Sequence, residues 1–226
     1  MRNAILIDQN IVITVDNTGC VGEKEHDLVN TSNELVAYYT ARVALIEQWC
    51  AGGQPTHIFM SNFTSDEAWS DYEKGIHRVF VEIGERMPTI SGSTESNFES
   101  LQSGISIMMV GKKIYDNNAE QCSWFIVGKP LVGEEILNEP EHIAKLNELY
   151  MLIKMGVIKS VWPVGSKGIR FECEKLFRDY DIECALPLEK TSGPASSVIV
   201  AVDRDQLEQF KDSISTIYEE IKLIQK

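Results

Sequence analysis

Short apolar runs and stretches of helical periodicity alternate over the first half of the chain. Two apolar runs, residues 5–7 and 11–15, are divided by three polar residues and predict a hairpin. Apolar residues recur at helical spacing over residues 32–51, with Ser32 as the cap and Gly52-Gly53 as the stop. The same analysis predicts strands at 57–63, 89–91 and 104–110 and a second helix at 66–83. The order β-β-α-β-α-β-β predicts a mixed α+β domain.

A polar segment, residues 112–121, separates this pattern from a second one. Strands and helices alternate again beyond it. We predict strands at 123–127, 158–162, 182–184 and 197–202, and helices at 142–155, 168–178 and 205–224. The last of these helices is amphipathic. The chain is therefore predicted to hold two domains, residues 1–115 and 120–226.

The net charge of the chain limits which classes of binding partner we expect. The chain carries 21 Lys and Arg against 34 Asp and Glu, a formal net charge of −13. Such a surface repels phosphodiester backbones and anionic lipids, so we expect neither nucleic acid nor a membrane as a partner. No apolar run approaches the roughly 18 residues of a membrane-spanning helix. The excess of acid is suited to holding divalent cations instead.

The five cysteines favour a reducing, cytoplasmic environment. They are odd in number and form no CxxC pair, and no two Cys or His residues stand at zinc-ligand spacing. The P-loop, the dinucleotide-binding glycine fingerprint and the nucleophile elbow of hydrolases do not occur. What remains as candidate chemistry is acidic residues beside glycine-rich turns.

One such turn follows the second predicted strand. Asp16 ends that strand and opens a loop that contains Gly19, Gly22 and Lys24. A carboxylate at a strand end can hold Mg²⁺, glycines let backbone amides approach phosphate, and lysine supplies positive charge. An ordinary capped turn selects the same residue types, so the pattern alone leaves both interpretations open.

For Glu47 and for residues 92–97 the sequence also allows both a functional and a structural interpretation. Glu47 lies inside the first predicted helix, where it is either a metal ligand or part of the polar face of the helix. Residues 92–97 carry polar side chains at five of six positions. That composition suits a ligand-binding loop and an ordinary polar loop equally.

Segments of the first half resemble the N-terminal domain of the PurM-like superfamily, which includes thiamine monophosphate kinase and the hydrogenase maturation protein HypE. Residues 12–17, Gly19 and residues 21–24 resemble the family's strand with a metal-binding Asp and its Gly-x-Gly-x-Lys turn. Residues 47–55 resemble its acid and Gly-Ala-x-Pro helix end, residues 59–63 its next strand, and residues 91–94 its Gly-Gly-Asp/Glu-Thr loop. The second half resembles the family's C-terminal domain more loosely.

Three positions depart from the family pattern. Asn3 stands where many members carry Asp before the first strand, and Glu47 replaces a more usual Asp. Ser93 stands where others have an acid, although Glu95 follows two residues later. These departures predict a metal site that is reduced or shifted toward Glu95, and they keep a non-catalytic homologue open.

Within the superfamily, residues 40–44 and 92–98 look most like a short bacterial branch related to AIR synthase, which includes α-ribazole kinases of cobalamin salvage. The resemblance implies an ATP- and Mg²⁺-dependent phosphotransferase, a kinase acting on a small nucleoside-like or vitamin-precursor metabolite such as α-ribazole. It also implies a PurM-like N-terminal domain whose sheet pairs into a barrel on dimerisation, followed by a PurM C-terminal-like α/β domain. The chain is therefore expected to form a homodimer. The alternative is a non-catalytic homologue that binds a nucleotide or metabolite.

The resemblance also implies a role for each candidate residue. Phosphoryl transfer depends on charge neutralisation and positioning more than on covalent help. The implied roles are metal binding by Asp16, Glu47 and Glu95; catalysis by Asp16 and Lys24; phosphate binding by Gly19, Gly22, Lys24, Gly92 and Thr94; and substrate binding by Asn62 and Asn97.

Overall fold

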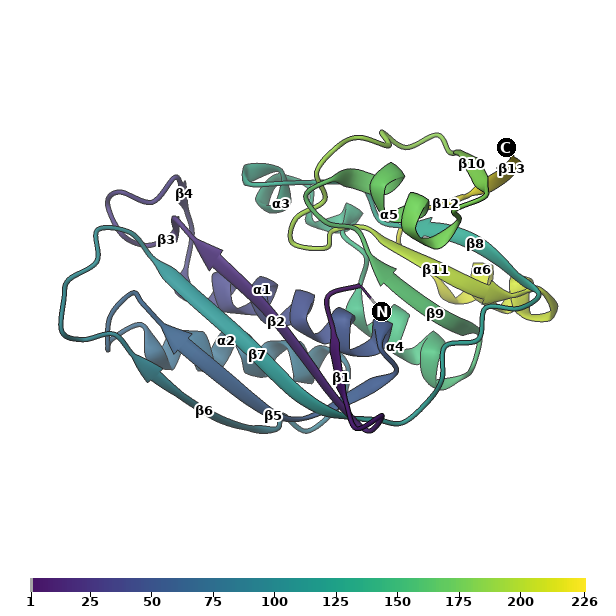
Figure 1. Cartoon of the computed structure of the whole chain (residues 1–226). Coiled ribbons are helices and arrows are strands. Elements are labelled where there is room, and N and C mark those ends of the chain that lie inside the picture. The colour runs from purple at the N-terminus through teal and green to yellow at the C-terminus, as the bar shows by residue number, and fades with distance from the viewer. Residues whose placement is uncertain (1) are drawn as a thin grey trace. The chain divides into compact units, whose positions relative to one another are not determined.

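The computed structural model describes residues 2–226 and divides the chain into two compact units (Figure 1). The first unit extends to Asp116 and the second begins at Asn117. The division falls within the polar segment 112–121, where few side chains are apolar enough to join either core.

The first unit is built on a five-stranded sheet with the strand order β1-β2-β7-β5-β6. All neighbouring strands are antiparallel except β5 and β6, which are parallel and joined through helix α2. Its elements are β1 (Ile5–Ile7), β2 (Ile11–Gly19), β3 (Val21–Gly22), β4 (Val29–Asn30), α1 (Asn33–Cys50), β5 (Gly53–Asn62), α2 (Trp69–Glu82), β6 (Thr89–Thr94) and β7 (Gly104–Lys113).

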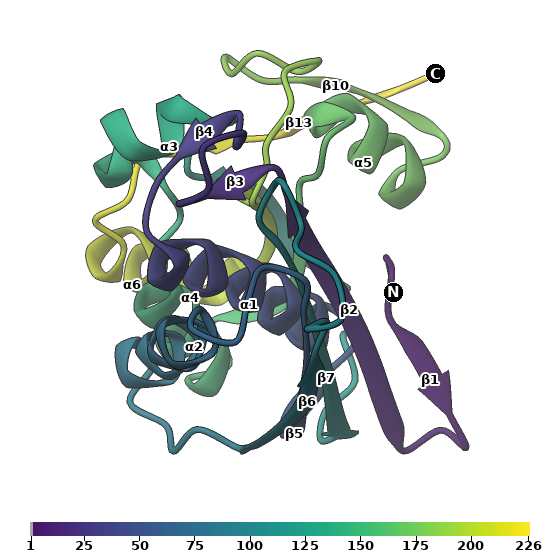
Figure 2. The ribbon, with the colours of Figure 1, turned by 90° about the vertical axis from the view of Figure 1, so that its left-hand side faces the viewer.

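Both long helices of this unit cover the same face of the sheet (Figure 2). Alternate strand residues such as Ile58, Ile107 and Met109 point to that face and are fully buried. Helix α1 is buried on almost every side, and its buried residues include the polar Thr40, Arg42, Glu47 and Gln48. The core of the unit therefore lies between α1, α2 and the sheet.

Local signals set the bounds of α1. The side chain of Ser32 accepts a hydrogen bond from the backbone N–H of Leu35 at 3.2 Å, so it caps the helix as predicted. The helix stops before Gly52, whose φ of +75° suits glycine. A Cβ at Gly52 would also overlap the backbone oxygen of Tyr115. The predicted cap and stop are thus both confirmed.

The opposite face of the sheet is open and largely apolar. Its strands align in rows across β2, β7 and β5, so that the outward side chains lie side by side. We call the apolar members the open face: Ile5, Ile7, Ile11, Ile13, Val15, Phe59, Met108 and Val110. A row of small polar residues, Asn17, Ser106, Ser61 and Ser93, borders it toward the carboxyl end of β2.

The second unit holds a four-stranded antiparallel sheet of order β12-β8-β11-β9 and a separate β10-β13 pair. Strand β11 (Val198–Asp203) is central and almost entirely buried. The other elements are β8 (Cys122–Val127), α3 (Glu134–Asn138), η1 (Pro140–His142), α4 (Leu146–Lys154), β9 (Ile158–Pro163), α5 (Gly168–Leu176), β10 (Tyr180–Glu183), η2 (Arg204–Gln206), α6 (Leu207–Ser213), β12 (Tyr218–Glu220) and β13 (Lys222–Gln225).

The predicted helix over residues 205–224 is wrong. Only α6 is α-helical there, and the chain beyond it becomes extended. Glu148 explains the break, because its carboxylate accepts hydrogen bonds from the backbone N–H of Thr216 and from the side chains of Ser215 and Thr216. Strands β12 and β13 then pair with β8 and β10, so long-range pairing overrides the local amphipathic pattern.

One other expectation needs adjustment. The predicted loop 92–97 begins inside strand β6, which runs to Thr94 in register with β5. Among the described residues no sheet closes into a barrel by itself, since β1 and β6 are both edge strands of the first sheet, and the barrel expected on dimerisation stays a prediction. The mixed α/β architecture itself agrees with the prediction.

Candidate functional site

Several candidate residues gather at one end of the first sheet, where β2, β5 and β6 end and β7 begins. Gly19 ends β2 opposite Gly104, and the turn after it is tied to the loop before β7. The N–H of Cys20 donates to the oxygen of Ser103 at 2.9 Å, and the ammonium of Lys24 donates to the oxygen of Ser100 at 2.6 Å. We call this junction of residues 19–33 and 95–104 the sheet end.

Carboxylates hold the sheet end together. Asp27 accepts hydrogen bonds from the backbone N–H groups of Lys24 and Ser103, at 2.9 and 2.8 Å. Glu23 accepts one from the N–H of Asn33, the first residue of α1, at 2.9 Å. Over residues 17–28 the only cationic side chain is Lys24, against the acids Glu23, Glu25 and Asp27. A phosphate group placed here therefore needs positive charge beyond that of Lys24.

Two buried polar atoms at the sheet end make no hydrogen bond within the described chain. They are Oδ1 of Asn33 and Oγ of Ser103, on residues that are 6% and 3% exposed. Buried polar atoms are normally paired, and one without a partner costs about 1–3 kcal/mol. An external hydrogen-bonding group would remove that cost.

The three candidate glycines differ in how much space surrounds the position of a Cβ atom. A Cβ at Gly19 would meet no atom within 4 Å, so its backbone is open to an approaching group. A Cβ at Gly22 would press against the side chain of Ser103. A Cβ at Gly92 would overlap the backbone oxygen of Met60 on the neighbouring strand. Glycine is thus required for packing at Gly22 and Gly92, whereas packing does not require it at Gly19.

The residues predicted for substrate binding lie across the sheet at the ends of β5 and β6. The amide nitrogen of Asn62 donates to Oγ1 of Thr94 at 3.2 Å and to the backbone oxygen of Ser65 at 2.6 Å. Glu95 is exposed and accepts a hydrogen bond from the N–H of Asn97 at 2.8 Å, which lowers the pKa of its carboxyl. Asn62, Thr94, Glu95 and Asn97 therefore form one connected group.

Asp16 lies on the helix-covered side of β2. It shares that side with Thr14 and Thr18, which hydrogen-bond to Ala44 and Thr40 of α1. Burial raises the pKa of Asp16 from its ordinary 3.8 to about 7. The N–H of Asn17 and the charge of Arg2 oppose this shift, and the charge of Glu47 adds to it. Asp16 and Glu47 thus interact electrostatically inside one buried region.

Glu47 is 1% exposed and is bound by the segment that precedes β1. The guanidinium of Arg2 forms an ion pair with its carboxylate. Asn3 adds two donors, its side-chain amide at 3.2 Å and its backbone N–H at 3.4 Å. Sequence patterns did not identify Arg2 because it lies 45 positions from its partner and in no periodic element.

The predicted three-acid metal site does not fit this arrangement. Strands β7 and β5 separate β2 from β6, which places Gly92, the β6 residue in the row of Asp16, about 14 Å from it at ordinary strand spacing, and Glu95 lies three residues beyond Gly92. The carboxylate of Glu47 is already engaged by Arg2 and Asn3. Over residues 2–226 no group of three or more Asp, Glu, His or Cys side chains could hold a metal ion. We therefore assign no chemical step to Mg²⁺.

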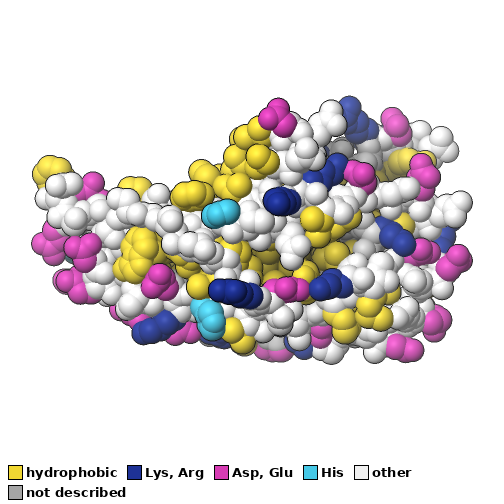
Figure 3. All heavy atoms as spheres, turned by 90° about the horizontal axis from the view of Figure 1, so that it is seen from below, with side chains coloured by type: hydrophobic (Ala, Val, Ile, Leu, Met, Phe, Trp, Pro, Cys, Tyr) yellow, Lys and Arg dark blue, Asp and Glu magenta, His cyan; other side chains and the backbone are white. Residues whose placement is uncertain are grey.

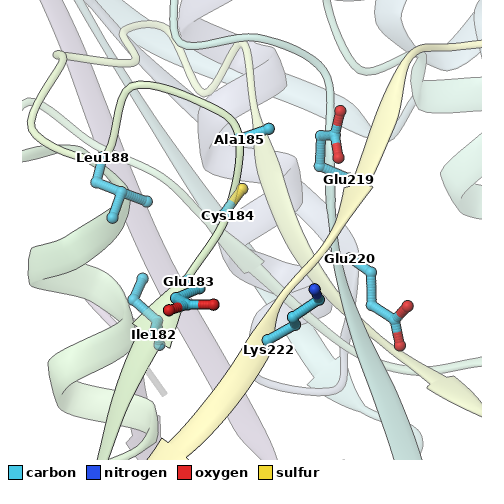
Figure 4. Close-up of a pocket in the computed structure, with 8 residues that line it drawn as sticks. All are labelled: Ile182, Glu183, Cys184, Ala185, Leu188, Glu219, Glu220 and Lys222. Atoms are coloured by element: carbon cyan, nitrogen blue, oxygen red, sulfur yellow. The ribbon is translucent and has the colours of Figure 1, made fainter.

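The second unit has a surface cavity of about 540 Å³ that sequence patterns did not indicate. Figure 4 shows it between β10, the segment after it, and strands β12 and β13. Its lining includes Glu183, Glu220 and Lys222, which are all exposed, and the half-buried Cys184. None of the buried unpaired polar atoms belongs to its lining, so it offers little to orient a ligand.

The loop 165–168, which leads into α5, has a packing role. Gly168 has a φ of +78°, and a Cβ there would collide with backbone atoms of residues 188–190. The ammonium of Lys167 lies 4.3 Å from the ring centre of Phe171. Both residues are accounted for by local structure.

The surface agrees with the acidic composition. On the face seen in Figure 3, Lys and Arg side chains stand among Asp and Glu and form no broad basic area. Within the described part of the chain, none of the helices combines the length and hydropathy needed to cross a bilayer.

Comparisons with known proteins identify the fold. Neither the protein-family models nor the curated proteins contain a match to this sequence. Among solved structures, thiamine monophosphate kinase from Aquifex aeolicus aligns over 100% of this chain and 89% of its own, with a TM-score of 0.68 at 13% identity. The same kinase, complexed with AMPPCP and TMP, aligns with a TM-score of 0.66 at 14% identity, covering 99% of this chain and 84% of its own.

A hydrogenase maturation protein HypE in complex with ATP covers 93% of this chain and 76% of its own, with a TM-score of 0.62 at 9% identity. At these identities the similarity concerns the fold. It agrees with the resemblance found in the sequence, because both proteins belong to the superfamily named there. The chain has the PurM-like fold.

Proposed function

We propose that the first unit binds ATP at the sheet end and transfers its terminal phosphoryl group to a small nucleoside-like or vitamin-precursor metabolite. The observations that carry the proposal are two buried unpaired atoms of the sheet end, Asn33 Oδ1 and Ser103 Oγ, and the open backbone of Gly19 in the same region. Structures of the same fold complexed with ATP or AMPPCP support it.

Each candidate residue at the sheet end has a defined task in this proposal. Gly19 leaves the backbone of the turn open to the triphosphate, Gly22 lets the turn pack on Ser103, and Lys24 contributes a positive charge that is half-buried and braced by Ser100. Gly92 and Thr94 border the phosphates, Asn97 orients the acceptor, and the buried Asn62 positions Thr94 through its amide. The acceptor's proton is released to solvent in this proposal, because Asp16 lies beside Glu47 on the helix-covered side of β2 and away from this group.

Gly19→Val tests the binding site without disturbing packing, because the space around Gly19 is empty. We expect an unchanged melting temperature and at least tenfold weaker binding of AMPPCP by calorimetry, about 1.4 kcal/mol. Gln54→Val, at an exposed position at the other end of the same sheet, is the control and should bind normally. Equal affinity in Gly19→Val and the wild type would place the nucleotide elsewhere.

The competing function is nucleotide or metabolite binding without turnover. The acids Glu23, Glu25 and Asp27 favour it, because they oppose the accumulation of negative charge at the sheet end. The two functions separate in an assay of ADP release with α-ribazole as the first acceptor, run with Mg²⁺ and with EDTA. Acceptor-dependent ADP release supports the kinase. Binding of AMPPCP without ADP release across a panel of nucleosides supports the binding module.

We also propose a homodimer formed through the open face. Eight apolar side chains on one sheet face make an area that a partner copy of the same sheet would cover. Val15→Lys, at the centre of the rows, should convert the dimer to a monomer in sedimentation experiments. Val81→Lys, an exposed apolar position on α2, should leave it dimeric. A monomeric wild type at high micromolar concentration would refute this arrangement.

A further inference from the structure

Glu47 is a buried carboxylate whose hydrogen-bonding needs are met by two consecutive residues of its own chain. Arg2 supplies an ion pair, and Asn3 supplies an amide donor at 3.2 Å and a backbone donor at 3.4 Å. Three donors and one full positive charge thus converge on one carboxylate. Nothing in the proposed phosphoryl transfer uses this arrangement.

We infer that Arg2 and Asn3 form a built-in counter-charge that occupies the position of a divalent cation at Glu47 and closes this acidic region to metal. We call residues 2–3 the cationic arm. The inference concerns metal binding by the free chain and holds whether or not the chain turns over ATP.

Burial makes this counter-charge effective. Arg2 is 12% exposed at its side chain and Glu47 is 1% exposed, so water screens their attraction weakly. An isolated carboxylate at this depth would carry a large desolvation cost, which the guanidinium offsets. A guanidinium stays protonated at every accessible pH, so the arm remains charged. A cation that binds Glu47 therefore competes with Arg2 for its carboxylate.

Asn3 points to the same conclusion through its chemistry. Its amide donates to Glu47, which a carboxylate at that position cannot do. Two carboxylates facing each other here would need a cation or a shared proton between them, whereas amide and carboxylate are complementary without either. The donor set of residues 2–3 therefore suits a metal-free Glu47.

The test measures cation binding directly, with Mn²⁺ followed by its electron paramagnetic resonance signal in the absence of nucleotide. Wild-type protein should show no site at Glu47 that fills below about 1 mM Mn²⁺, the weak end of carboxylate-site affinities. The double variant R2Q/N3D removes the guanidinium and replaces the amide donor by an acid. It should bind Mn²⁺ at least tenfold more tightly than the wild type, and excess Mg²⁺ should compete.

Two controls separate this inference from a general charge effect. R78Q/S70D makes the same change in net charge on α2, where Arg78 faces Glu34 at 3.7 Å and both side chains are exposed. It should bind Mn²⁺ like the wild type. Adding Glu47→Gln to R2Q/N3D should return the affinity to the wild-type value, because the central ligand is gone.

Two results would overturn the inference. One is a wild-type site with submillimolar affinity for Mn²⁺ that Glu47→Gln abolishes. The other is a folded R2Q/N3D, judged by circular dichroism, that gains no affinity. If the double variant does not fold, Arg2→Gln alone carries the test with the same expected direction and the same refuting outcome. A purely structural ion pair predicts lower stability for these variants but no gain in Mn²⁺ binding.

Discussion

Replacing Asp16 by Asn should stabilise the first unit at neutral and alkaline pH. Burial raises the pKa of this carboxyl from 3.8 to about 7, so the folded state holds its proton more tightly than the unfolded state. The stabilisation given by that proton is complete below pH 4 and is lost as the pH rises through 7. Asn keeps the shape of the side chain and has no charge to desolvate.

The magnitude follows from the size of the shift. A shift of about three units at about 1.4 kcal/mol per unit gives an upper limit of about 4 kcal/mol for the penalty at pH 8. At pH 5, two units below the folded pKa, the wild type regains about 3 kcal/mol of it. The advantage of Asp16→Asn should therefore be large at pH 8 and small at pH 5.

Urea denaturation of both proteins at pH 5 and pH 8 measures this advantage, since the other titrating groups cancel in the comparison. Asp66→Asn, at an exposed position before α2, is the control and should change stability by less than about 0.5 kcal/mol at either pH. Two results would refute the assigned burial of Asp16. One is an Asp16→Asn protein that is less stable than the wild type at pH 8. The other is a difference in free energy of unfolding between the two proteins that is the same at pH 5 and pH 8.

Three other substitutions test the packing described above. Ser32→Ala removes the cap of α1 and should lower the free energy of unfolding by about 1 kcal/mol in urea denaturation. Ser32→Asp keeps a capping oxygen and should keep most of the wild-type stability. An unchanged stability in Ser32→Ala would contradict the cap. Gly75→Ala places a Cβ against the backbone of Glu34, where α1 and α2 pack together, and should lower the free energy of unfolding in urea by about 1–3 kcal/mol; a gain in stability, as Ala gives at an open helical position, would contradict the close packing. Glu148→Gln weakens the hydrogen bonds to Ser215 and Thr216 and should cost about 1–3 kcal/mol, against almost nothing for the exposed Glu208→Gln.

Elements with strong local signals were predictable from sequence. Helix α1 was predicted at 32–51 and found at Asn33–Cys50, because its cap, its apolar spacing and its glycine stop agree. Strand β2 extends four residues beyond the predicted 11–15, since its ladder with β7 continues to Gly104. Polar residues such as Asn17 join the strand only because a partner strand is present, which a local pattern does not reveal.

The candidate site also depends on long-range contacts that a local sequence pattern does not reveal. The Gly19–Lys24 turn and its ties to residues 100–103 lie close together in space, but hydrogen bonds across more than 70 positions hold them there. The grouping of Asp16 with Glu47 was expected from the resemblance, whereas the partners of Glu47 were not. Arg2 and Asn3 reach it from a segment with no periodicity, so only the folded chain brings them together.

Helix α1 also sets a distance within the first unit. Asn33 begins this helix at the sheet end and Glu47 lies fourteen residues further along it, about 21 Å at 1.5 Å per residue. That span exceeds the reach of a single small ligand held at the sheet end. Because α1 is buried on nearly all sides, it moves as a rigid rod if it moves at all. Coupling between the sheet end and the surroundings of Glu47 would then require a shift of the whole helix along its axis. Such a shift would move the Ser32 cap at one end and the Arg2–Glu47 pair at the other by the same distance.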